Sequence, residues 1–134
     1  MTKLIIYTDG GARGNPGPAG IGAAIYNDQK ELVAELSEYL GETTNNQAEY
    51  RAVIAALKKA AEIKADELDF YLDSELVVRQ LNREYKVKNK DLAPLFLQIH
   101  NLVLAFKKVS FTHVRREDNK RADMLANRAM DKGA

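Results

Sequence analysis

Apolar and polar positions follow two periods along this chain, and together they predict alternating strands and helices. Short apolar runs or strict alternation, typical of strands, occur five times. These segments are residues 4–7, 21–26, 32–36, 68–72 and 109–113. Because the first three follow one another with no helical pattern between them, they predict an antiparallel meander.

Longer segments with apolar residues three and four positions apart predict four helices. They span about residues 45–64, 74–82, 94–106 and 119–130. Residues 43–46 offer several N-cap candidates for the first helix, Ser74 is the candidate for the second, and Asp118 or Asn119 for the last. Pro94 suits the first turn of the third helix. The predicted order is therefore βββαβααβα.

This order predicts an α/β domain. Strands separated by helices should be parallel, with right-handed crossovers, which places the first, fourth and fifth strands side by side and the meander at one edge. Ligand sites in such sheets lie beyond the carboxyl ends of the parallel strands. Asp9 and Asp73 each end the apolar run of one of these strands. Strand order and acid placement therefore predict the same site.

Two further carboxylates, Glu49 and Asp123, interrupt helical apolar patterns. Carboxylates resist burial unless they are paired or bound to metal. If the fold gathers all four acids, a divalent cation relieves their repulsion, and oxygen-only ligands suit Mg²⁺ or Mn²⁺. Other interpretations stay open here. Glu49 could pair with Arg13 or Arg51 on a solvated face, and Asp73 and Asp123 could be first-turn helix acids.

The segment from Gly10 to Gly22 holds six of the eight glycines, together with Pro16 and Pro18. It predicts a long, tight connection between the first two strands. A hairpin turn does not need this much glycine, so we expect backbone that approaches a ligand closely. The segment contains neither GxxxxGK[ST] nor GxGxxG, which removes the main support for nucleoside triphosphate or dinucleotide binding.

Composition narrows the class of protein. A length of 134 residues with 46% hydrophobic positions suits a single domain, residues 1–134, with a proper core. No stretch approaches the roughly 20 apolar residues of a membrane span, and we expect no signal peptide. The absence of cysteine excludes disulfides, thiolate metal sites and thiol nucleophiles. A cytoplasmic location fits these features.

The net charge of +1 gives no general argument for a polyanionic partner, but basic residues gather in one place. Between Arg79 and Lys90 there are five basic residues and a single acid, Glu84. Such a run is either a solvated face or a patch that contacts phosphates.

Five short blocks, taken in order, resemble ribonuclease H of type 1. They are Tyr7-Thr8-Asp9-Gly10-Gly11, Gly14-Asn15-Pro16-Gly17, Thr44-Asn45-Asn46-Gln47-Ala48-Glu49, Asp73-Ser74 and Asn119-Lys120-Arg121-Ala122-Asp123. Each block is modest alone, but the ordered set is highly specific and spans nearly the whole chain. The resemblance implies the ribonuclease H-like fold, a five-stranded mixed sheet with helices on both faces. It also implies endonucleolytic cleavage of the RNA strand of RNA·DNA hybrids with two Mg²⁺ ions, for which Mn²⁺ can substitute.

Carried over to this sequence, the resemblance assigns roles to particular residues. Asp9, Glu49, Asp73 and Asp123 look like the catalytic, metal-binding acids. We expect substrate contacts from nine residues, namely Gly10, Gly11, Arg13, Asn15, Thr44, Asn45, Asn46, Ser74 and Glu75. We expect a monomer, and double-stranded RNA stays open as a second substrate.

The chain departs from the family's pattern in three places. Many relatives carry a histidine in the loop before the last acid. Here the link 114–118 has none, so Arg115 or Arg116 is the expected source of charge stabilisation, while His113 falls at a strand end. Glu75 stands where several relatives have glutamine, so it can accept from a 2′-OH but cannot donate. In place of the basic protrusion of some relatives we expect a smaller basic patch, made of Arg83, Lys86, Lys88 and Lys90.

Two other functions compete with this one. A non-catalytic nucleic-acid binder gains nothing from four acids that face phosphates. A flavodoxin-like small-molecule binder does not begin with an antiparallel meander.

Overall fold

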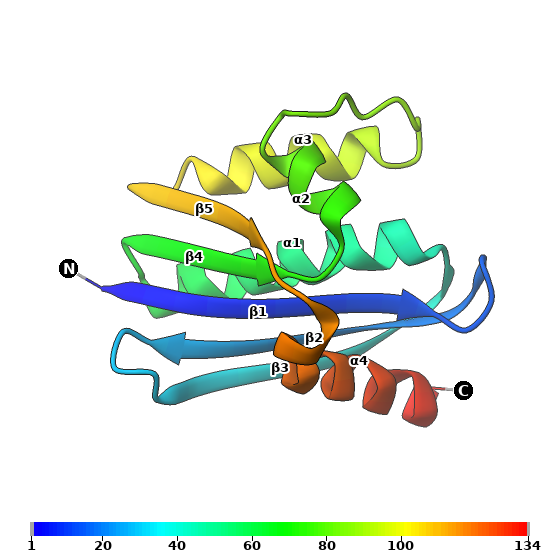
Figure 1. Ribbon diagram of the computed structural model, residues 1–134, viewed down its shortest axis with the longest axis horizontal. Coiled ribbons are helices and arrows are strands. Elements are labelled where there is room, and N and C mark those ends of the chain that lie inside the picture. The colour runs from blue at the N-terminus through cyan, green and yellow to red at the C-terminus, as the bar shows by residue number, and fades with distance from the viewer. Residues whose placement is uncertain (1, 134) are drawn as a thin grey trace.

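The computed structural model describes residues 2–133 and confirms the predicted order of elements. Its five strands form one mixed sheet in the order β3-β2-β1-β4-β5. The strands are β1 (Lys3–Ala12), β2 (Gly17–Asn27), β3 (Leu32–Thr43), β4 (Glu67–Leu72) and β5 (Lys108–His113). The meander β1-β2-β3 is antiparallel, whereas β1, β4 and β5 run parallel (Figure 1).

Four α-helices and one 3₁₀ turn complete the chain. They are α1 (Asn45–Ile63), α2 (Glu75–Leu81), α3 (Ala93–Val103), η1 (Arg116–Asp118) and α4 (Lys120–Gly133). The Thr44 side chain accepts from the Gln47 N–H, which makes Thr44 the cap among the four candidates. The Ser74 side chain accepts from the Val77 N–H, which confirms the predicted cap of the second helix. The predicted end of the third helix at Phe106 is wrong. Beyond Val103 the backbone bonds tighten to i→i−3, and the chain turns into β5.

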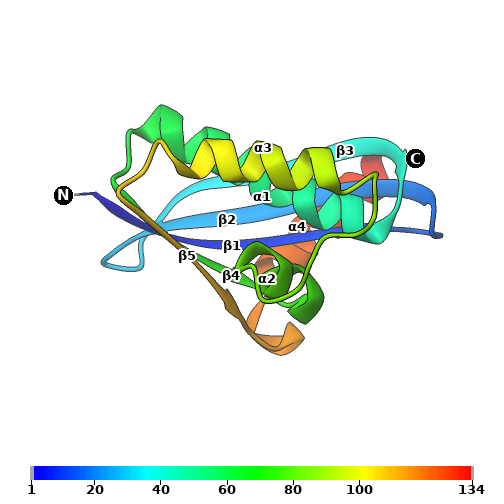
Figure 2. The same ribbon diagram turned by 90° about the horizontal axis from the view of Figure 1, so that it is seen from above.

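Helices cover both faces of the sheet, as predicted. Gly10 and Gly22 point to opposite faces, because Gly22 pairs with Asp9, the residue before Gly10. A Cβ on Gly10 would lie 2.3 Å from the Ala48 carbonyl oxygen of α1. A Cβ on Gly22 would lie 2.2 Å from the Ala122 carbonyl oxygen of α4. In Figure 1, α1 lies behind the central strands and α4 in front of the β2–β3 edge, and Figure 2 shows α3 beside α1.

The prediction of a long connection between Gly10 and Gly22 is therefore wrong. Both strands continue into this segment, and only residues 13–16 lie between them. Three of its glycines, Gly10, Gly20 and Gly22, let helices approach the sheet backbone closely. Glycine's low strand propensity hid these strand positions in the sequence.

The core lies mainly between the sheet and α1. Its largest fully buried apolar side chains there include Ile6, Tyr50, Leu57, Leu68 and Phe70. Among residues 2–133, no helix is both long and apolar enough to cross a bilayer.

Candidate metal centre

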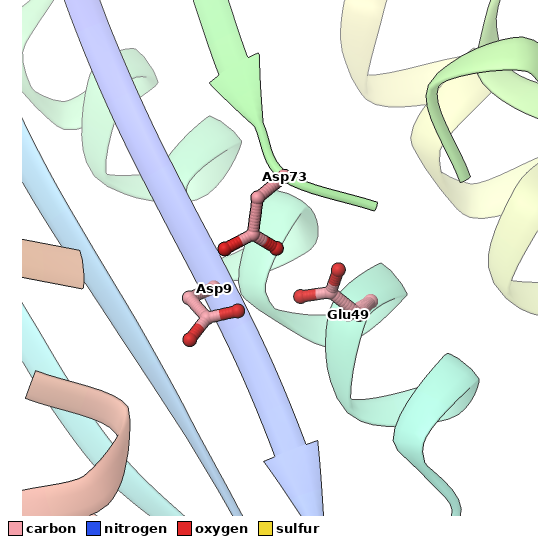
Figure 3. A group of neighbouring side chains, drawn as sticks. All are labelled: Asp9, Glu49 and Asp73. Carbon is pink, nitrogen blue, oxygen red and sulfur yellow. The ribbon is translucent and has the colours of Figure 1, made fainter. Parts of the chain in front are cut away.

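Three carboxylates meet where β4 ends beside β1. Asp9 belongs to β1, Asp73 directly follows β4, and Glu49 lies near the start of α1. Each offers an oxygen, and these oxygens all lie within 4.8 Å of one another. Figure 3 shows the three carboxylates pointing toward one another from three separate elements. Such a set of oxygens can hold Mg²⁺ or Mn²⁺.

The short length of β4 makes room for Glu49. Pairing between β4 and β1 stops at Leu72 opposite Thr8, whereas β1 continues to Ala12. Beyond that point the Gly10 N–H donates to Glu49 Oε1 at 2.6 Å. Gly10 has no Cβ, so α1 can lie close enough for this bond. Glu49 thus takes the place of strand pairing at the end of the sheet.

Burial and mutual repulsion disfavour the charged forms of these acids. Burial, the neighbouring Asp73 carboxylate and Asp123 together raise the pKa of Asp9 to about 8. Burial also raises the pKa of Glu49 well above its ordinary value, and the charges of Asp9 and Asp73 add to this effect. In residues 2–133 no lysine or arginine forms an ion pair with the four acids. The cluster therefore favours binding protons or an external cation.

Asp123 stands beside Asp9 rather than within the set of three. It lies in the first turn of α4, and it lines the same groove as the other acids. Asn127, one turn further along α4, donates to the Asp123 carbonyl at 2.9 Å. The structure therefore brings all four predicted acids to one groove.

Asn119 is a site residue whose role the sequence analysis missed. Its Nδ2 donates to the Thr8 carbonyl at 2.9 Å and to Asp73 Oδ2 at 3.4 Å, and the residue is only 1% exposed. It thereby ties β1, Asp73 and the start of α4 together. An asparagine before a helix looks like an ordinary cap, so the sequence held no separate sign of this role.

The groove over the acids has a volume of about 560 Å³. Besides the four acids, it takes in six of the nine expected substrate contacts, which are Gly10, Gly11, Arg13, Asn45, Asn46 and Ser74. Asn15 lies just outside and accepts from the Asn45 N–H at 3.1 Å, while Asn45 Oδ1 accepts from the Ala12 N–H at 2.8 Å. These two bonds hold the asparagine side of the groove to β1.

The two remaining expected contacts, Thr44 and Glu75, do not line the groove. Thr44 caps α1, and Glu75 pairs with Arg79 at 2.9 Å on the exposed side of α2. Arg13 forms an ion pair with Asp131 and not with Glu49, which was the alternative pairing.

The two candidate arginines separate in the structure. Arg116 lines the groove, whereas Arg115 is exposed and lies 3.6 Å from Glu117 and 3.9 Å from Asp118. His113 is exposed at the end of β5. Charge stabilisation therefore stays a prediction for Arg116 and loses its geometric support for Arg115.

The expected basic patch lies in the connection between α2 and α3, away from the groove lining. Its four residues, Arg83, Lys86, Lys88 and Lys90, are all exposed. Arg83 lies 2.5 Å from Nδ1 of His100 on α3. Contact of this patch with phosphates stays a prediction.

Comparison with known proteins places the chain in a family. The family described as reverse transcriptase-like matches residues 7–129. The chain is 44% identical over 133 residues to the bifunctional protein Rv2228c of Mycobacterium tuberculosis, a match that covers 98% of this chain and 36% of that protein. It is 36% identical over 152 residues to the ribonuclease H of Ruthia magnifica, with 98% of each protein covered.

Solved structures agree with the sequence comparisons. The structure of LC11-RNase H1 in complex with an RNA/DNA hybrid matches with a TM-score of 0.93 and 46% identity. The match covers 97% of this chain and 98% of that one. Strand order, helix placement and the acid cluster define a ribonuclease H-like domain. The chain belongs to the ribonuclease H family. It spans about a third, 36%, of the length of the first curated relatives it matches.

Proposed function

We propose that this chain cleaves the RNA strand of RNA·DNA hybrids endonucleolytically, with divalent metal ions held by Asp9, Glu49, Asp73 and Asp123. The observation that carries the proposal is the convergence of three carboxylates with which no lysine or arginine of residues 2–133 forms an ion pair. It is supported by membership of the ribonuclease H family and by the similarity to LC11-RNase H1, whose structure holds an RNA/DNA hybrid.

The donor set fits a hard divalent cation. All candidate ligands are carboxylate oxygens, and burial together with the neighbouring carboxylates raises the pKa of Asp9 and of Glu49, which favours binding of a cation. We propose two Mg²⁺ ions, with Mn²⁺ as a substitute. Such ions supply charge stabilisation at the scissile phosphate and make the attacking water more acidic.

The protein's own residues then position the hybrid. Asp9 lies on the central strand and contacts both Glu49 and Asp123, so it would be the acid that both ions share. One Glu49 oxygen is already bound by the Gly10 N–H, which leaves the other to accept from an RNA 2′-OH and to link cleavage to RNA. Asn45 and Asn46 offer amides along the groove, and Arg116 offers a guanidinium to phosphate.

The test is a cleavage gel with four substrates: RNA·DNA hybrid, RNA·RNA, DNA·DNA and single-stranded RNA. Each is incubated with chelator, with Mg²⁺ and with Mn²⁺. We expect cleavage of the hybrid only when metal is present, and the RNA·RNA lane decides whether double-stranded RNA is a second substrate. Asp73→Asn should abolish cleavage. The matched control is Asp69→Asn, four residues earlier on β4 and outside the groove. Hybrid cleavage that survives in Asp73→Asn would refute the proposal.

We further propose a monomer and a cytoplasmic location. Size-exclusion chromatography with light scattering tests the first, and fractionation of cells that express the tagged chain tests the second.

A further inference from the structure

A second cavity lies on the same sheet face as Asp9. Three tyrosines line it: Tyr7 from β1, Tyr26 from β2 and Tyr71 from β4. Tyr26 pairs with Ile5, and Tyr71 pairs with Tyr7, so the three rings project from adjacent strands on one face. We call this cavity of about 450 Å³ the tyrosine pocket. Its size falls within the range of ligand sites, roughly 300–1,000 Å³.

The rings give the tyrosine pocket aromatic walls. Tyr7 and Tyr71 stack with ring centroids 5.1 Å apart, and Tyr26 meets Tyr7 edge-on at 6.0 Å. All three side chains remain partly accessible to solvent. On this face α4 packs beside Gly20 and Gly22, which leaves the tyrosines of β1 and β4 beyond its first turn. An aromatic ligand ring could therefore pack against them.

Two basic residues and one acid line the tyrosine pocket. Lys30, in the β2–β3 turn, is exposed and forms no ion pair within residues 2–133. Arg121 stands on the α4 side and pairs with Glu35. Asp118 lines the pocket as well. An aromatic ring with an anionic group next to it, which is the chemistry of a nucleotide, complements tyrosines flanked by Lys30 and Arg121.

The tyrosine pocket adjoins the carboxylate groove. Tyr7 and Asp9 are two residues apart on β1 and point to the same face, about 7 Å along the strand. Asn119 lines the pocket and also donates to Asp73 Oδ2 at 3.4 Å, so one buried side chain separates the two sites. A strand bound in the groove therefore has the pocket within reach of its next nucleotides.

We propose that the tyrosine pocket binds an unpaired nucleotide that flanks the hybrid in the groove, so that hybrids with a single-stranded extension are the preferred substrates. This inference rests on the proposed function, because the groove must hold a hybrid. Base–aromatic stacking tolerates any base, so the preference is for an unpaired end rather than for a sequence.

The first experiment measures the pocket without cleavage. 5′-AMP is titrated in chelator while the backbone amides are followed by NMR. We expect saturable shifts near residues 5–7, 26–30 and 118–121. Tyr26→Leu keeps the apolar bulk but removes the ring, and should weaken binding about five- to 150-fold, the range that corresponds to one lost stacking contact. Tyr39→Leu, an exposed tyrosine on β3, is the matched control and should change nothing.

Two further arms separate the base from the phosphate. Lys30→Gln should weaken 5′-AMP binding but leave adenosine binding unchanged, while Lys58→Gln, on the exposed side of α1, should affect neither. Inorganic phosphate alone should not shift the same amides. The absence of saturable binding by 5′-AMP, or equal affinity in folded Tyr26→Leu and wild type, overturns the proposal.

The second experiment compares KM for a blunt hybrid and for hybrids with a short overhang at the 5′ or 3′ end of either strand. At least one overhang should lower KM in the wild type without changing kcat, and Tyr26→Leu should abolish that advantage while it cleaves the blunt hybrid normally. Equal KM values for all substrates overturn the proposal. If the wild type cleaves no hybrid but 5′-AMP binds in a Tyr26-dependent way, the proposed function fails and the pocket stands.

Discussion

Two aspartates at the β1–β4 pair have their pKa values shifted in opposite directions by their surroundings. Asp69 and Asp9 point to the same face of the same two strands. Lys3 Nζ lies 3.0 Å from Asp69 Oδ2, and Ser110 donates to Asp69 Oδ1 at 2.8 Å. Burial alone would raise the pKa of Asp69, but these partners outweigh it and hold that pKa below its ordinary value. At the other end the pKa of Asp9 is raised to about 8.

The difference shows how this fold separates a structural acid from a functional one. A neighbouring strand position can carry a lysine or a hydroxyl that stabilises a charged aspartate. Asp69 has both partners, Lys3 and Ser110. At Asp9 the nearest neighbours are other carboxylates, so the site favours a proton or a cation from solution.

The largest expected effect comes from Asp9→Asn. It should abolish hybrid cleavage and raise the melting temperature in chelator by several degrees, because one repelling charge disappears from a crowded site. Gel cleavage and thermal unfolding measure the two halves. Asp69→Asn should do the opposite, with cleavage retained and a lower melting temperature. A lower melting temperature in Asp9→Asn would show that the acids do not repel one another in the folded protein.

The free energy of unfolding in chelator should fall as pH rises from about 4 to about 8. Asp9 has a pKa of about 8 when folded and about 3.9 when unfolded. Over this window the folded state binds more protons, so raising the pH destabilises it, by at most about 1.4 kcal/mol per pH unit from this group. Denaturant titrations at several pH values measure the slope.

The control for the pH effect is the same series with Asp9→Asn, whose slope should be flatter across the window. Saturating Mg²⁺ should also flatten it in the wild type, because the bound ion replaces the proton. A wild-type slope no steeper than that of Asp9→Asn would contradict the raised pKa.

The basic patch lies away from the acids, so its residues should affect the affinity for the hybrid and not kcat. Replacement of Arg83, Lys86, Lys88 and Lys90 by glutamine should weaken hybrid binding and lower the slope of log K against log salt by about 0.9 for each lost phosphate contact. The kcat at saturating hybrid should barely change. The control replaces Lys58 on α1 and Lys64 at the C-cap of that helix, and should leave the slope unchanged. An unaltered slope in the fourfold variant would identify the run as a solvated surface.

The smallest expected effect is a difference in kcat between variants of the two arginines that precede α4. Arg116→Ala should lower kcat about tenfold, because its guanidinium lines the groove where phosphate charge develops. The Arg116→Ala substitution should leave the melting temperature unchanged. Removal of Lys3, which forms an ion pair with Asp69, should lower it. Arg115→Ala and His113→Ala should have little effect on kcat. A loss of kcat in His113→Ala as large as that in Arg116→Ala, with an unchanged melting temperature, would instead assign that histidine a role in the reaction.

The sequence predicted the features that depend on short-range patterns. Strand and helix order followed from periodicity, and Asp9 and Asp73 were expected to converge because parallel strands end at one edge. It could not show that β1 runs on to Ala12, because Gly10 and Gly22 look like turn residues until the helices that press on them are known. The roles of Asn119 and the grouping of Tyr7 with Tyr26 and Tyr71 depend on strand register, which no local pattern encodes.

The bond between Gly10 and Glu49 has a practical consequence. Glu49 Oε1 already accepts a backbone N–H that no strand satisfies, so the side chain stabilises the end of the sheet in addition to its proposed role as a metal ligand. Alanine at this position would remove both roles and expose a gap at the end of the sheet. Glutamine retains an oxygen for the Gly10 N–H and removes only the charge. If Glu49 binds metal as proposed, Glu49→Gln should be folded but inactive, so that an intact hybrid could be captured on it for crystallography.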